Sequence, residues 1–210
     1  MIDETKIRSL RYKLERENLG LVGRSNYSVC AKIAADKDDF WGYLSPKWEA
    51  HRDPKIFSAW LKAAGDDAII ISDTHPITSF LVVFPPGYSG IRKPVFYREC
   101  GCASVLRYGL PFFRNFAGFA DLSAQLQKKY SGKLAWYIAK MIGGADSCEK
   151  ILTFFLNWID SFGGVIYTET LAGNDASSAA QHGFFEVESG KIGEMEYHGL
   201  IRPMNGKKTW

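Results

Sequence analysis

The segment from Lys133 to Pro203 reads KLAWYIAKMIGGADSCEKILTFFLNWIDSFGGVIYTETLAGNDASSAAQHGFFEVESGKIGEMEYHGLIRP. Its periodicity predicts a strand over 134–142, a helix over about 147–162, a strand over 165–171, a short helix and two closing strands. The first strand enters the long helix through Gly143 and Gly144. Free backbone N–H groups and the positive end of the helix dipole favour an anion at such a junction. The segment therefore predicts an α/β (α+β) fold with an anion site beside the helix N-terminus.

The end of this segment resembles the GNAT acyltransferase superfamily. In that pattern the fifth strand ends near an Asn, here Asn174, a short helix follows, and a Gly-Phe pair, here Gly183-Phe184, opens the sixth strand. Residues 194–203 correspond to the seventh strand. The resemblance implies a GNAT-like central mixed twisted sheet of about seven strands, flanked by helices.

The coenzyme loop departs from the family pattern, which is Arg/Gln-x-x-Gly-x-Gly/Ala. The two family glycines fall on Asp146 and Cys148, whereas Gly143 and Gly144 lie closer to the strand. A carboxylate at Asp146 is unfavourable near a pyrophosphate unless it points away as a helix cap. The resemblance nevertheless implies acetyl-coenzyme A, or another acyl-CoA, as co-substrate. The residues implied as its contacts are Met141 and Ile142 for the pantetheine arm, and Gly143, Gly144, Ala145, Ser147, Cys148 and Asn174.

Acyl transfer to an amine needs a base for the amine and, in many enzymes, an acid for the departing thiolate. Strand alternation places Tyr167 and Glu169 on one face and Thr168 and Thr170 on the other. We expect Glu169 to be the base, acting directly or through water. The family often places a tyrosine acid in the short helix after the Asn, and the shortened segment after Asn174 has none. Tyr167, Tyr137 and Tyr197 are candidate acids because they lie on the strands that would surround the site. Asn174 itself can bond a ligand amide or cap the short helix.

Composition describes an ordinary globular chain. Its 210 residues are 46% hydrophobic and 23% charged, with a net charge of +3 that is too small to indicate nucleic acid by itself. No apolar run reaches the roughly 18–20 residues that a membrane helix needs, and the polar start is unlike a signal peptide. We therefore expect a cytoplasmic protein that is not embedded in a membrane, and a homodimer stays open.

The cysteines and histidines do not indicate a metal site. Cys100 and Cys102 have the wrong spacing for a zinc pair, and none of the four histidines is spaced with another ligand. We expect reduced thiols and no metal. Cys148, at a helix start, is expected to have a thiol pKa lowered by the dipole.

The residues before Lys133 are expected to form elements in an order that resembles the N-terminal part of a GNAT domain. A charged helix over 4–17 is followed by a loop, a strand over 27–34 and a helix after Asp36–Asp39. Asp53 and Pro54 predict the cap and first position of a helix over 55–64 that ends at Gly65. Strands are expected over 68–72 and 78–84. We expect a single GNAT-like domain over 1–210, with an N-terminal helical extension over 1–25.

Residues 87–130 form a long insert between the third and fourth strands. The insert mixes arginines and lysines with many aromatic residues, and only residues 121–130 show a clear helical pattern. Three interpretations stay open for the rest: an extra hairpin over 95–106 with its aromatics in the core, a wall for substrate or coenzyme, or a nucleic-acid surface.

Two classes of function follow. The first is an acyltransferase, most directly an acetyl-coenzyme A-dependent N-acetyltransferase acting on a small-molecule or protein amine. The second is a non-catalytic GNAT-like binding or inhibitory protein, which Asp146 and the missing tyrosine favour. A narrower variant of the first uses acyl-carrier protein or aminoacyl-tRNA as the acyl donor, with the insert as its docking surface.

Overall fold

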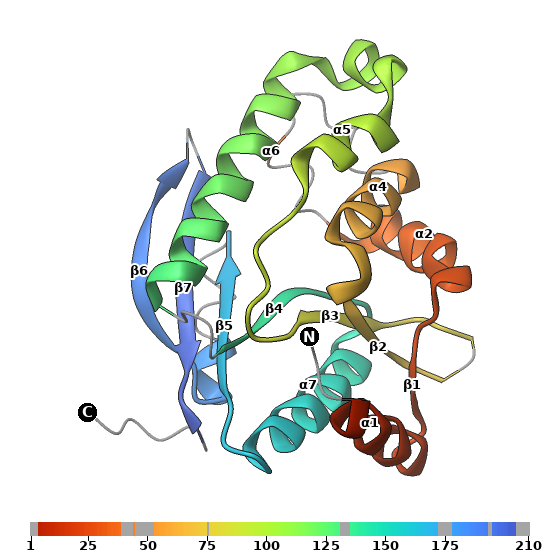
Figure 1. Cartoon of the computed structure of the whole chain (residues 1–210), viewed down its shortest axis with the longest axis vertical. Helices are drawn as coiled ribbons and strands as arrows, with labels where there is room; N and C mark the ends of the chain where they lie inside the picture. Colours follow the sequence, from red (N-terminus) through yellow and green to blue (C-terminus); the bar gives the residue numbers. More distant parts are fainter. Residues whose placement is uncertain are drawn as a thin grey trace.

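The protein is described by a computed structural model that covers residues 4–38, 44, 53–74, 76–130, 135–171, 178–192 and 195–204. A seven-stranded sheet with the order β1-β2-β3-β4-β5-β7-β6 forms its centre (Figure 1). The strands are β1 (Leu19–Leu21), β2 (Ile69–Asp73), β3 (Phe80–Phe84), β4 (Ala135–Ile142), β5 (Val165–Thr170), β6 (Phe185–Ile192) and β7 (Met195–Arg202). The pair β4–β5 is parallel and the other neighbouring pairs are antiparallel. This mixed sheet confirms the predicted fold class.

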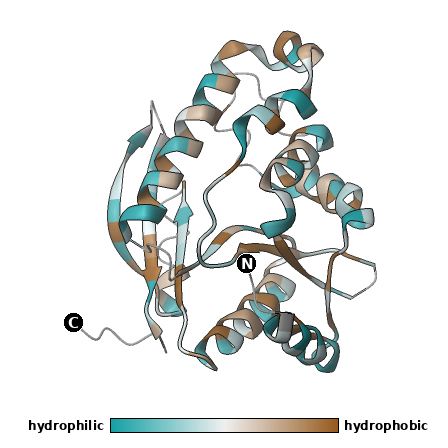
Figure 2. Cartoon of the chain, in the orientation of Figure 1, coloured by the Kyte–Doolittle hydropathy of each residue, from teal (hydrophilic) through white to brown (hydrophobic). Residues whose placement is uncertain are grey.

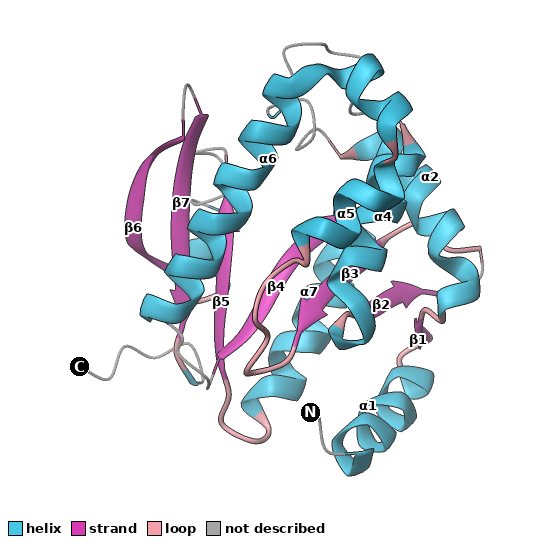
Figure 3. Ribbon diagram, turned by 45° about the horizontal axis from the view of Figure 1, so that its top comes forward, coloured by secondary structure: helices cyan, strands magenta, loops and turns pink. Residues whose placement is uncertain are grey.

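Helices cover both faces of the sheet (Figure 3). They are α1 (Glu4–Arg16), α2 (Tyr27–Lys37), α4 (Pro54–Ala64), α5 (Lys93–Cys100), α6 (Cys102–Tyr130) and α7 (Ala145–Asp160), with 3-10 turns at Arg24–Asn26 and Gly65–Asp67. Helices α1 and α7 pack on one face around Leu10, Ile151 and Phe155. Helices α2, α4, α5 and α6 pack on the other face. Among the described residues, no helix has the length and apolar character needed to cross a bilayer.

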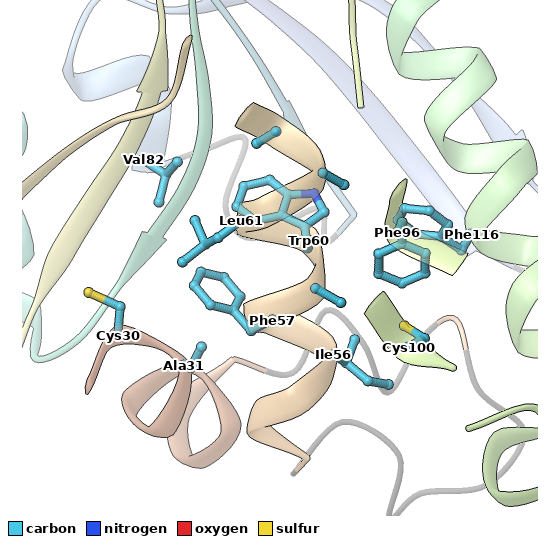
Figure 4. Packing of buried hydrophobic residues seen from close by; sticks show 14 of the residues in the cluster. Cys30, Ala31, Ile56, Phe57, Trp60, Leu61, Val82, Phe96, Cys100 and Phe116 are labelled. Atoms are coloured by element: carbon cyan, nitrogen blue, oxygen red, sulfur yellow. The ribbon is translucent and has the colours of Figure 1, made fainter. Parts of the chain in front are cut away.

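The core on the α4 face is built from small and aromatic side chains. Figure 4 shows α4 packed between Cys30 and Ala31 of α2 on one side and Phe96 and Phe116 on the other. Strand β3, which is third in the sheet, is entirely buried, and it is among the most apolar parts of the sheet in Figure 2. As predicted, α4 begins with the Asp53 side chain accepting from the Lys55 N–H group at 2.8 Å and ends at Gly65.

The expected strand over 27–34 is wrong, because these residues open α2. The buried residues of this helix recur at helical spacing and are mostly alanine, which has the highest helix propensity: they are Cys30, Ala31, Ala34 and Ala35. The first strand lies in the expected loop instead, at β1, which pairs with β2. The expected helix after Asp39 falls outside the described residues, apart from Leu44, which is helical and buried.

The expected hairpin over 95–106 is also wrong. This part of the insert forms α5 and the start of α6, separated by Gly101 with φ 72°. Its buried residues are spaced for helices, with Phe96 four before Cys100 and Phe112 four before Phe116. At Gly109 the backbone is not helical (φ 79°, ψ 160°), so α6 changes direction there. Its second part crosses β5, β7 and β6 and includes the helix expected over 121–130.

Candidate functional site

The site begins where β4 and β5 separate. Their parallel pairing runs from Ala135–Val165 to Ile138–Thr168 and then stops, although both strands continue. On its other edge β4 pairs with β3, and the register skips Ala139 between Ile138 and Lys140. Such a bulge bends a strand and increases its twist. The strands therefore diverge as a V (Figure 3), and the β4 backbone beyond Ile138 has no β5 partner.

A cavity of about 730 Å³ occupies this gap. On the α7 face it is lined by residues that include Cys148, Leu152, Thr168 and His182, and on the α6 face by residues that include Trp60, Tyr88, Ser123, Tyr137 and Glu169. The cavity therefore connects the two faces through the sheet. Its volume lies within the 300–1,000 Å³ typical of small-molecule sites.

Helix α7 presents its N-terminus to the α7-face half of the cavity. Gly143 has a φ of 145°, and a Cβ there would lie 2.1 Å from Ser79 Oγ. This close approach lets the Gly144 N–H group donate to Ser79 Oγ at 3.1 Å. The Cys148 N–H group already donates to the Gly144 carbonyl at 2.9 Å. Of the amides expected to hold a pyrophosphate, those of Gly144 and Cys148 are thus bonded within the chain. The first-turn amides of Ala145, Asp146 and Ser147 have no partner within the helix.

Only some of the other expected coenzyme contacts lie at the cavity. Met141 is 45% exposed and lines the cavity, as do Ala145 and Cys148. The side chain of Ile142 is buried in the core on the α4 face, so only its backbone is a candidate contact. Asn174 lies outside the described residues.

The expected low pKa of Cys148 is wrong. Burial raises the pKa of this thiol, and the carboxylate of Asp73 raises it further. The desolvation of a thiolate outweighs the helix dipole here. Cys148 is therefore an apolar lining residue at neutral pH. All four cysteines are free, and within the described part of the chain no group of His, Cys, Asp and Glu has the arrangement of a metal site.

Asp146 is exposed and does not cap α7, since the helix has no side-chain cap. It lines a second hollow, between α1 and α7, together with the basic residues Lys13, Arg16 and Lys150. Asp146 is not among the described residues that line the cavity between β4 and β5. This position weakens the objection that its carboxylate would repel a coenzyme pyrophosphate.

Glu169 lies on the α6 face at the point where the strands part. Its Oε2 accepts from the Tyr137 hydroxyl at 3.2 Å, and Tyr137 Oη lies 3.3 Å from Ser123 Oγ. Burial raises the pKa of Glu169 to about 7, while the hydroxyls of Ser123, Tyr137 and Tyr167 act to lower it. A carboxylate with this pKa exchanges protons readily at neutral pH, as a general base must.

Of the three expected acids, Tyr137 alone lines the cavity. Tyr167 is fully buried behind Glu169, and its Oη and Glu169 Oε1 have no hydrogen-bond partner among the described residues. Burial raises the pKa of Tyr137 and of Tyr167, so both hydroxyls stay protonated. The Tyr197 hydroxyl donates to Glu188 Oε1 at 3.5 Å, and Tyr197 is not among the described residues that line the cavity.

Several lining residues were not predicted from the sequence. Ser123 and Gln127 are one turn apart on α6 and joined by a 3.0 Å hydrogen bond. A polar pair on the apolar side of a predicted helix was the available signal. Trp60 and Tyr88 carry no such signal, because the fold alone brings them to this position.

The insert lines the cavity, and most of its charged groups are paired within the chain. Arg92 bonds the carbonyls of Ala63 and Lys62 at the end of α4. Lys93 pairs with Asp121 at 2.6 Å, and Arg107 pairs with Asp53 at 3.0 Å. These pairings do not favour the nucleic-acid interpretation of the insert.

The fold was compared with those of known proteins. No family model matches the sequence, and no curated protein does. Solved structures do match, and three of those with TM-scores of 0.57 illustrate the similarity. They are the histone acetyltransferase HPA2 and related acetyltransferase from Corynebacterium glutamicum (10% identity, 89% of this chain and 96% of that one), an N-acetyltransferase from Staphylococcus aureus Mu50 (14%, 87% and 98%) and arylalkylamine N-acetyltransferase 2 from Aedes aegypti (11%, 89% and 98%). The protein therefore has the fold of the GNAT N-acetyltransferases.

Proposed function

We propose that this protein is an acyltransferase that moves an acyl group, most directly acetyl, from coenzyme A to an amine. The observation that carries this proposal is the position of Glu169, whose carboxylate has a pKa of about 7 and lies in the gap between β4 and β5. The fold shared with three named acetyltransferases supports the same class of reaction.

The cavity suggests how the two substrates would be arranged. The donor would enter on the α7 face, with its pyrophosphate at the amides of Ala145, Asp146 and Ser147 and its pantetheine arm along Met141 and Ile142. The amine would enter on the α6 face, beside Glu169. The thioester would then lie in the gap, so that the two reactants meet through the sheet.

The chemical step follows from this arrangement. Glu169 takes a proton from the ammonium group, and the neutral nitrogen attacks the thioester carbonyl carbon. The C–S bond breaks as the tetrahedral intermediate collapses, which yields an amide and the coenzyme A thiolate. The nitrogen loses its second proton as the amide forms, and the thiolate takes up one proton, so the two transfers cancel. The Tyr137 hydroxyl is the nearest described acid that could protonate the thiolate.

The first test is calorimetric titration with acetyl-coenzyme A. We expect saturable binding in the micromolar range. The variant Ala145→Pro removes one first-turn amide donor at the helix position that tolerates proline, after a residue with extended backbone (Gly144, φ −73°, ψ 146°). The loss of one hydrogen bond to a charged group corresponds to about a tenfold to hundredfold weaker binding.

A matched variant, Asp146→Gly, separates the two classes of function. Binding by the parent chain together with amine-dependent thiol release supports the transferase. Binding only after Asp146→Gly would mean that the loop is closed to the coenzyme, and would favour the non-catalytic alternative. If neither chain binds the coenzyme, the proposal is wrong for coenzyme A, and an acyl-carrier protein is the donor to test next.

A further inference from the structure

The half of the cavity on the α6 face is walled by aromatic rings. They come from four elements and one loop: Trp60, Phe84, Tyr88, Phe116, Phe119 and Tyr137. Aromatic side chains give a binding site a large apolar contact area with defined ring geometry. A wall of this composition favours a flat apolar ligand.

Three of these rings are nearly parallel. Tyr88 stacks on Phe84 with a centroid distance of 3.8 Å and an interplanar angle of 13°, and it lies 6.4 Å from Tyr137 at 14°. Trp60 meets Phe84 edge-on at 6.3 Å. Phe84 is fully buried, so its ring holds the stack in place, and Tyr88 lies at the start of the insert.

The charges in the cavity point to a cationic ligand. Lys140 pairs with Asp38 at 3.2 Å, and both side chains are at most 13% exposed. On the α7 face, His182 lies 3.1 Å from Glu149. Glu169 has only hydroxyl neighbours and forms no ion pair among the described residues. Among the described residues, the aromatic half of the cavity therefore carries one carboxylate without a cationic partner, which an ammonium group would complement.

The carboxylate and the ring stack lie close together. Tyr137 belongs to both, since its ring lies 6.4 Å from that of Tyr88 and its hydroxyl lies 3.2 Å from Glu169 Oε2. A ligand that reaches both features needs only a short spacer between its ring and its nitrogen.

We propose that the acyl acceptor is a small primary amine joined to an aromatic ring by a short spacer, with its nitrogen at Glu169 and its ring against Tyr88. This inference rests on the proposed function and names its acceptor class. Tyr88, and with it Phe119 of α6, would determine specificity. Protein amines and unbranched alkylamines would be poorer acceptors, because they offer no ring to the wall.

The test compares 2-phenylethylamine with n-butylamine as acceptors, by thiol release from acetyl-coenzyme A at pH 8. We expect kcat/KM to be about tenfold higher for 2-phenylethylamine. Tyr88→Leu should lower kcat/KM for 2-phenylethylamine about three- to tenfold, the range of one aromatic contact, and so reduce or abolish the preference for 2-phenylethylamine over n-butylamine. Tyr88→Phe keeps the ring and should keep the preference. Tyr12→Leu removes a tyrosine that is 64% exposed on α1 and serves as the control.

The outcomes separate this inference from the proposed function. Equal use of both amines, or a preference that survives in both Tyr88→Leu and Phe119→Ala, would overturn the acceptor class and leave the transferase intact. Calorimetry with 2-phenylethylamine alone covers the case in which acetyl-coenzyme A does not bind. Saturable binding that Tyr88→Leu weakens would still support the aromatic amine site, and absence of binding by the parent chain would refute it.

Discussion

Glu169→Gln should stabilise the protein above neutral pH while removing its activity. The pKa of Glu169 is about 7 in the folded protein against an ordinary value of 4.5. Below pH 4.5 both states are protonated. Between pH 4.5 and 7 the unfolded chain releases this proton and the folded chain keeps it, so the free energy of unfolding falls as the pH rises. Above pH 7 the loss is complete, at about 3 kcal/mol for this shift.

Glutamine has no proton to lose, so the variant should avoid this decrease. Its amide can still accept from Tyr137, and its N–H group can donate to the Tyr167 hydroxyl, which lacks a partner among the described residues. Urea unfolding at pH 5 and pH 8, followed by tryptophan fluorescence, should show the variant gaining about 2–3 kcal/mol relative to the parent between the two pH values. For a chain of this size the gain corresponds to roughly 4–12 °C in Tm. Loss of the proposed general base should lower kcat about 10²- to 10⁴-fold.

Glu188→Gln is the matched control, because Glu188 and Glu169 both lie beside Gly199 in the sheet. A hydrogen bond from Lys129, followed by one from Tyr130, lowers the pKa of Glu188. Its contribution to stability is therefore present above pH 4.5 and lost as the pH falls, so this variant should be less stable at pH 8, the opposite sign. If the parent and Glu169→Gln respond equally to pH between 5 and 8, the carboxylate is not buried as described and its role as the base loses its support.

Two further variants test the framework of the site. Gly143→Ala should destabilise the protein by more than about 2 kcal/mol and weaken coenzyme binding, because the new Cβ would lie 2.6 Å from Ser79 Cα. The control Gly144→Ala meets no atom within 4 Å and should fold normally. Equal stability of the two variants in urea would contradict the packing. Arg202→Met should lower the free energy of unfolding by about 3–5 kcal/mol, because Arg202 is 7% exposed and donates two 2.7 Å hydrogen bonds to Asp160. Lys191→Met removes the exposed Lys191–Glu196 pair and should lower it by at most about 1 kcal/mol. Similar losses in the two variants would refute the burial argument.

The C-terminal third was predictable because its signals are local. Gly143 and Gly144 mark the junction of β4 and α7, and the alternation in β5 places Tyr167 and Glu169 on one face. Those predictions depend only on neighbours in sequence, and the periods of strands and helices are fixed by backbone geometry. Even so, the boundaries of α7 lie two residues before the predicted ones, as expected where no side-chain cap marks the start.

The first strand and the insert were mispredicted for different reasons. β1 has three residues and acquires its strand form by pairing with β2, so its sequence carries little signal of its own. In the insert, aromatic residues suggested a hairpin because they favour strands, yet their spacing of four residues matched a helix buried on one side. Tertiary packing decided both outcomes.

The insert and the candidate base depend on each other physically. The second part of α6 lies over β5, and its Ser123 touches the Tyr137 hydroxyl that bonds Glu169. Without this helix, water would reach the carboxylate, and its pKa would fall toward 4.5 because desolvation is what raises it. A base with that pKa would be ionised but weak at neutral pH. The change of direction at Gly109 is what allows one helix to pack against α5 and still cover β5. The raised pKa of Glu169 is therefore a property of two segments far apart in sequence, and neither segment predicts it alone.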